Sequence, residues 1–100
     1  MLDLGKLQQK LYKVKLLDGT ILQIPKPSQL LLKKMMDLEK TENKATDLLY
    51  EINNILFEIF NTNKNGIKYT LEDIEKMFDL SIALAVIKDY ISFSFDILVE

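Results

Sequence analysis

The stretch from Tyr12 to Ser28, YKVKLLDGTILQIPKPS, decides the fold of this chain of 100 residues. In its first half, apolar side chains alternate with lysines, which is the period of a half-buried strand. The pair Asp18-Gly19 comes next and is typical of a type I′ turn, in which both central residues take positive φ. We therefore predict an antiparallel hairpin with strands over residues 12–17 and 20–24, joined by a two-residue turn.

A two-residue turn also predicts the register of this hairpin. It pairs Leu16 with Ile21 and places Val14 opposite Gln23. Leu22 and Ile24 then lie on the other face of the hairpin, opposite lysines, so that the second strand is apolar on both faces. Because an isolated hairpin is marginally stable in water, we expect helices to cover it.

Helix signals fill the rest of the chain. Two prolines end the second strand because neither can donate a backbone hydrogen bond, and Ser28 is a favourable N-cap. Thr70 and Asp73 form a capping-box pattern, and Asp79 is placed to cap a final helix. We predict helices over residues 28–40, 46–60, 70–78 and 80–98.

These elements define the predicted fold class. It is an α+β fold, mainly helical, with an N-terminal β-hairpin followed by a small bundle of about four helices. We expect a single domain over residues 1–100, with an arm and the hairpin in residues 1–27 and the helical part in residues 28–100.

The composition excludes several kinds of chemistry. The chain has no His, Cys or Trp, and all 13 of its basic residues are lysines. It therefore lacks a thiol nucleophile, the commonest general base and the guanidinium fork that reads guanine. The net charge of −2 gives no attraction to nucleic acid. We expect no enzymatic activity, no cofactor, no bound metal and no nucleic-acid partner.

Neither end of the chain resembles a targeting or membrane segment. The first six residues lack a basic region followed by an apolar run. The most apolar stretch, residues 80–99, is interrupted by Lys88, Asp89 and Asp96, whereas a spanning helix needs about 20 mostly apolar residues. We expect a protein of the bacterial cytoplasm that does not enter the membrane.

The segment after the second long helix resembles a calcium-binding EF-hand loop in its spacing. Asn61, Asn63 and Asn65 occupy the positions of the first three ligands, Gly66 the sixth position and Glu72 the twelfth. Only Glu72 among these brings a negative charge. We therefore interpret the segment as an Asn- and Gly-rich turn followed by a capped helix, without a metal.

Residues 70–91 have the rhythm of a helix-turn-helix motif. A recognition helix presents polar side chains to the base edges, but this second helix would present mainly aliphatic ones, Ile82 to Ile87. We interpret the rhythm as a helical corner.

The final helix has an unusually wide apolar face. Its polar residues fall within one sector, whereas apolar residues fill more than half of the helical wheel. Such a helix needs cover on two sides, either from the chain itself or from a partner. We predict that one flank is an oligomer or partner surface, and name the following stripe as the candidate: Ile82, Val86, Tyr90, Phe93 and Ile97.

The order of these pieces resembles a known family. The hairpin YKVKLLDGTILQIPKPS leads into QLLLKKMMDLEK, and the corner NKNGIKYTLEDIEKMFDLS precedes an apolar final helix. This order is similar to that of the tail assembly chaperones of long-tailed phages and prophages. The resemblance extends over nearly the whole chain from Leu4, and its composition, rich in Lys, Asn and Ile, suits an AT-rich genome.

The resemblance implies a non-enzymatic role. Such chaperones self-associate, coat the long tape measure protein and keep it soluble until tail tube subunits polymerise around it. The resemblance therefore implies a homo-oligomer whose partners are the tape measure protein and the tail tube protein. The alternative is a regulatory or antitoxin-like adaptor that binds one globular protein, because an apolar helix face also suits that role.

Overall fold

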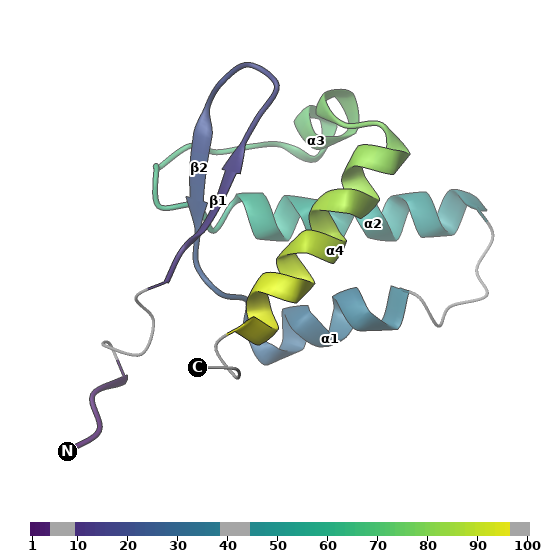
Figure 1. Cartoon of the computed structure of the whole chain (residues 1–100). Coiled ribbons are helices and arrows are strands. Elements are labelled where there is room, and N and C mark those ends of the chain that lie inside the picture. Colours follow the sequence, from purple (N-terminus) through teal and green to yellow (C-terminus); the bar gives the residue numbers. More distant parts are fainter. Residues whose placement is uncertain (5–9, 39–44, 97–100) are drawn as a thin grey trace.

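The computed structural model describes residues 1–4, 10–38 and 45–96 (Figure 1). A two-stranded sheet precedes the helices, as predicted, which confirms the α+β fold class. The elements, in chain order, are β1 (Tyr12–Lys15), β2 (Ile21–Ile24), α1 (Gln29–Asp37), α2 (Ala45–Phe60), α3 (Leu71–Met77) and α4 (Leu80–Asp96).

Helix α2 packs against each of the other three helices. Helix α4 crosses α2 and also contacts α1, the hairpin lies alongside α4, and α3 lies near the first turns of α4 (Figure 1). No helix within the described ranges is both long enough and apolar enough to cross a membrane.

The predicted register of the hairpin is wrong by one residue. Val14 lies opposite Leu22, and Tyr12 lies opposite Ile24. The turn contains three residues, since the Leu16 amide donates to the Thr20 carbonyl at 2.7 Å and only Gly19 has a positive φ, of 92°. This geometry is a type I turn followed by a bulge glycine.

The extra turn residue has a clear effect on the two faces of the hairpin. A shift of one residue moves a whole side-chain set to the opposite face. In the observed register, the buried side chains of both strands lie on one face, and Lys13, Lys15, Gln23 and Ile21 lie on the other. Leu22 and Ile24 therefore lie opposite Val14 and Tyr12 and not opposite lysines, while Ile21 on the other face is exposed.

The loop between α2 and α3 covers the free edge of β2. The Lys64 amide donates to the Gln23 carbonyl at 2.8 Å. The side chain of Asn65 accepts from the Gln23 amide at 2.9 Å and donates to the Ile21 carbonyl at 3.2 Å. Three outward-facing backbone groups of β2 are thus satisfied without a third strand.

The predicted helix starts are confirmed at three positions. Ser28 accepts from the Leu31 amide at the start of α1, and Thr70 and Asp73 form a reciprocal capping box at the start of α3. The Asp79 carboxylate accepts from the Ile82 amide at 2.8 Å, which caps α4. The predicted ends of the first and last helices, residues 39–40 and 97–98, lie outside the described residues.

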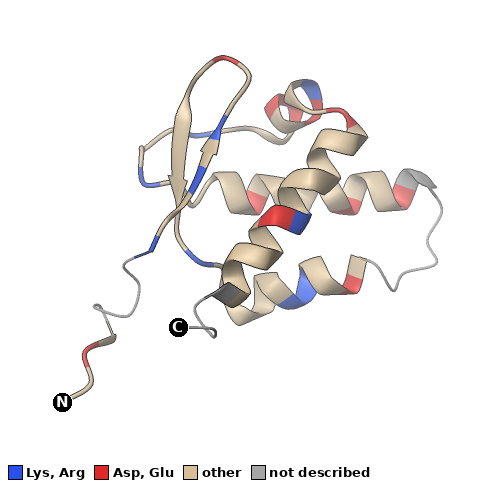
Figure 2. Cartoon of the chain, viewed as in Figure 1, with Lys and Arg blue, Asp and Glu red and all other residues tan. Residues whose placement is uncertain are grey.

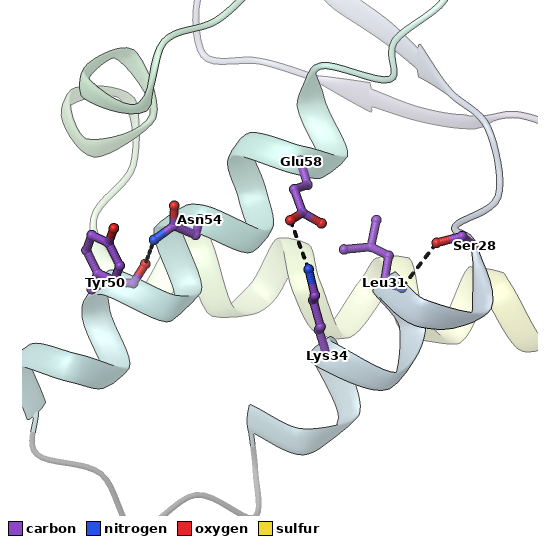
Figure 3. A network of polar contacts seen from close by, with 6 residues as sticks. All are labelled: Ser28, Leu31, Lys34, Tyr50, Asn54 and Glu58. Carbon is purple, nitrogen blue, oxygen red and sulfur yellow. Dashed lines mark hydrogen bonds and ion pairs between the residues drawn. The ribbon is translucent and has the colours of Figure 1, made fainter.

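The core lies where the helices meet the apolar face of the hairpin. Its most deeply buried side chains come from the second strand and all four helices: Leu22, Ile24, Met35, Ile52, Leu56, Ile59, Phe60, Ile74 and Tyr90. A hydrogen-bonded ion pair, Lys34–Glu58 at 3.1 Å, joins α1 to α2 at the surface (Figure 3). Such an exposed pair contributes little to stability.

Candidate functional site

The wide apolar face of α4 has two flanks on either side of a buried row. Ala83, Ile87 and Tyr90 form that row and are 1–3% exposed. The residues of the predicted polar sector whose side chains are described are all exposed: Ser81, Ala85, Lys88, Asp89 and Ser92. Figure 2 shows that the charges of α4 form one short band, with uncharged residues before and after it.

The hairpin covers much of the first flank. The Tyr12 ring lies 5.1 Å from the Tyr90 ring and 5.3 Å from the Phe93 ring, between centroids. The Tyr12 hydroxyl donates to the Asp89 carboxylate at 2.7 Å, and the Tyr90 hydroxyl donates to the Pro25 carbonyl. Burial raises the pKa of both tyrosines above its ordinary value, and the Asp89 carboxylate raises that of Tyr12 further.

A lysine adds to the cover on this side. The Lys26 ammonium lies 5.5 Å from the centroid of the Phe93 ring, within the range of a cation–π contact. Its nitrogen is buried without a hydrogen bond. The ring is therefore held between the hairpin and the segment that follows it.

These contacts locate the predicted interface stripe. Tyr90 is 1% exposed and belongs to the core of the chain itself, so we no longer place it on a partner surface. Phe93 packs against the hairpin, and Ile82 and Val86 are half-buried. Ile97 lies outside the described residues. On this flank Tyr12 packs against Tyr90 and Phe93.

The second flank of α4 forms one wall of an apolar hollow of about 360 Å³. Helices α1 and α2 form the other walls. The lining residues are aliphatic or Met apart from one lysine: Met35, Leu38, Leu48, Leu84, Ile87, Lys88 and Ile91. Leu48, Leu84 and Ile91 are only half-buried, so apolar surface remains accessible at this position.

A second hollow, of about 440 Å³, lies at the start of α4, between α2 and α3. Leu49 and Leu80 are 43% and 47% exposed and border it. Glu75 and Asp79 place two carboxylates at the same position. The two hollows have no lining residue in common, but both are bordered by leucines of α2 and α4. We call the two hollows together the α4 furrow.

A hollow of different character lies between α1 and α2. It has a volume of about 350 Å³, and the Lys34–Glu58 ion pair and the exposed Tyr50 border it (Figure 3). Most of its lining is polar or charged: Lys34, Asp37, Leu38, Tyr50, Glu51, Asn54, Ile55 and Glu58. We favour the α4 furrow as the binding site because apolar contacts provide most of the free energy of association.

The Asn-rich loop uses its side chains for its own structure. The Asn61 oxygen accepts from the Tyr69 amide at 2.8 Å, and the Asn63 oxygen accepts from the Asn65 and Ile67 amides. Asn65 binds the edge of β2. Within the described ranges, no three His, Cys, Asp or Glu residues lie together where they could hold a metal ion.

The sequence contained the signal for the α4 furrow, although the predicted stripe followed the other flank. Leu80, Leu84, Ile87 and Ile91 follow the 4-3-4 spacing of a coiled-coil seam. The wide apolar arc included all four residues. Which flank the hairpin covers depends on the contact between Tyr12 and α4, and no local pattern reveals that contact.

Comparisons of this chain with protein-family models, with curated proteins and with solved structures found no match.

Proposed function

We propose that this protein is a tail assembly chaperone of a long-tailed phage or prophage. In this proposal the α4 furrow binds helices of the tape measure protein and keeps that protein soluble until tail tube subunits assemble around it. The observation that carries the proposal is the apolar furrow itself, in which half-buried and exposed leucines on two helices border a concave surface.

The shape and chemistry of the furrow suit a helical client. An amphipathic helix places apolar side chains at i, i+3, i+4 and i+7, and an apolar groove between helices can receive them. A long client with repeated apolar positions could bind many copies of the chaperone without a sequence-specific contact. The resemblance in element order supports the same role.

Coexpression in bacteria tests this proposal. The tape measure protein from the same virion gene cluster is produced with and without this chain. We expect the client to become soluble and to co-purify with the chaperone only when both are present. Leu49→Asn and Leu80→Gln should each weaken the complex by about tenfold, since burial of one aliphatic side chain contributes roughly 1.5 kcal/mol.

Leu30→Gln is the matched control. Leu30 is 67% exposed on α1 and does not line the furrow, so its substitution should leave the complex unchanged. A client that stays insoluble in the presence of folded wild-type chaperone would refute the proposal. A one-to-one complex with a globular protein of the same gene cluster would favour the adaptor instead.

A further inference from the structure

We propose that the outer edge of β1 binds an extended acidic segment of a partner protein, which adds to the hairpin as a third, antiparallel strand. This inference goes beyond the proposed function and does not rest on it, because no residue of β1 lines the α4 furrow. It gives the hairpin a binding surface of its own, for a partner whose chemistry differs from that of an apolar helix.

The two edges of the hairpin differ in their backbone hydrogen bonds. At the edge of β2, the α2–α3 loop binds the outward-facing groups of Gln23 and Ile21. These residues lie opposite Lys13 and Lys15. Residues opposite each other in an antiparallel pair point their backbone groups either both toward the other strand or both away from it. The N–H and C=O groups of Lys13 and Lys15 therefore point away from β2.

These four outward-facing groups leave the edge of β1 open to another strand. Within residues 1–4, 10–38 and 45–96, neither Lys13 nor Lys15 has a backbone hydrogen bond on this side. Both residues are exposed. Backbone hydrogen bonds to such an edge provide the affinity when an extended peptide adds to a sheet, and its alternate side chains provide the specificity.

The charges at this edge select an acidic segment. In an added antiparallel strand, the residue opposite Lys13 or Lys15 exchanges two backbone hydrogen bonds with it and places its side chain on the same face. An Asp or Glu at these two positions faces an ammonium group, and each such pair is favourable by about 0.2–1 kcal/mol. A second copy of β1 would instead place lysines opposite lysines, which disfavours pairing between edges of this chain.

An apolar hollow at the end of β1 can receive a side chain from the opposite face of the added strand. It has a volume of about 290 Å³ and lies between the hairpin turn and the end of α3 (Figure 1). Its lining residues are Leu16, Leu17, Asp18, Tyr69, Met77 and Phe78.

This hollow predicts the other residues of the partner segment. Leu16 belongs to the buried face of the hairpin, opposite to the face of the two lysines. Because side chains alternate along a strand, a segment with acidic residues beside the lysines turns its other side chains to the face of Leu16. The Asp18 carboxylate disfavours an acid in the hollow. We therefore expect a segment in which acidic and apolar residues alternate.

Fluorescence anisotropy with synthetic peptides tests the inference. The probe is a fluorescein-labelled peptide of about seven residues, a typical strand length, in which Glu and Val alternate. A second peptide carries Lys in place of Glu. We expect saturable binding of the acidic peptide and at least about tenfold weaker binding of the basic one. The double variant Lys13→Glu, Lys15→Glu should reverse this preference.

The double variant Lys33→Glu, Lys88→Glu is the matched control. It makes the same change of net charge at exposed positions of α1 and α4, so it should keep the preference of the wild type for the acidic peptide. Circular dichroism checks that both double variants are folded.

N-methylation of the peptide backbone distinguishes strand addition from attraction between charges alone. In the proposed arrangement, the N–H group of each Glu points toward β1 and that of each Val points away. Methylation of the Glu amides should weaken binding by at least about tenfold, since each lost hydrogen bond contributes about 0.5–1.5 kcal/mol. Methylation of the Val amides should leave the affinity unchanged.

Three results would each overturn the inference. The first is an acidic peptide that shows no saturable binding up to about 1 mM, where the free energy of association is only about −4 kcal/mol. The second is an unchanged preference for the acidic peptide in the Lys13→Glu, Lys15→Glu variant. The third is an equal loss of affinity on methylation of the Glu and of the Val amides.

Discussion

At the scale of single residues, the Asn65 side chain takes the place of part of a third strand. Its amide group pairs with one N–H and one C=O group of β2, as a neighbouring strand would. The sequence predicted a turn at this position from the Asn and Gly residues. It could not predict the partner, because the hydrogen bonds join residues 42 and 44 positions apart.

We predict that Asn65→Ala lowers the free energy of unfolding by about 1 kcal/mol. The substitution removes two hydrogen bonds, each contributing about 0.5–1.5 kcal/mol, and water can partly replace them at this exposed edge. Urea denaturation followed by circular dichroism measures the change. Lys64→Ala serves as the control, since Lys64 contributes its backbone amide and should keep wild-type stability. Equal stabilities of Asn65→Ala and wild type would contradict the prediction.

At the scale of elements, the hairpin shows where sequence patterns succeed and where they fail. Alternation in residues 12–17 correctly predicted a strand, and Asp18-Gly19 correctly located the turn. The same dipeptide suits both a two-residue turn and a three-residue turn with a bulge glycine. Burial decided between them, since only the observed register places Tyr12, Val14, Leu22 and Ile24 on the side that faces the core.

We predict that Gly19→Ala destabilises the protein by about 1–2 kcal/mol. A Cβ at this position would meet no atom within 4 Å, so the cost arises from the backbone, whose φ of 92° is unfavourable for L-residues. Thermal unfolding measures the effect. Gly19→Asn should cost less, because Asn tolerates left-handed conformations better than Ala. An Ala variant as stable as the wild type would show that the turn relaxes to another conformation.

Helix α4 gives the same lesson for the binding site. Its wide apolar arc predicted that the helix needs cover on two sides, and Tyr12 packs against one of them. The arc alone could not show which flank packs against the hairpin, because Tyr12 and its hydrogen-bond partner Asp89 lie 77 positions apart in the sequence. The 4-3-4 seam was readable in the sequence, but its accessibility depends on how α1 and α2 pack.

At the scale of the whole molecule, the contact between Tyr12 and α4 joins the first strand to the last helix. The hydroxyl of Tyr12 reaches the Asp89 carboxylate, and its ring packs on Tyr90 and Phe93. Two neighbouring buried tyrosines therefore lie where the hairpin meets the helices. Their protonation is coupled to folding because their pKa values differ between the folded and unfolded states.

We predict that the stability of the protein falls as the pH rises above about 10, the ordinary pKa of tyrosine. Burial, and for Tyr12 also the Asp89 carboxylate, raises the pKa of both tyrosines in the folded state. In this range the unfolded chain loses these protons while the folded chain retains them, so alkali favours unfolding. Each tyrosine contributes up to about 1.4 kcal/mol per pH unit, and below this range the contribution is constant.

Urea denaturation at a series of pH values from 8 to 11 measures this fall in stability. Tyr12→Phe removes one of the two ionisable groups and keeps the ring, so its stability should fall less steeply with pH than that of the wild type. Tyr50→Phe, at a tyrosine that is 64% exposed, is the matched control and should keep the wild-type slope. If both variants show the same slope, the Tyr12 hydroxyl is not protected by folding, and the hairpin does not dock on α4 through this contact.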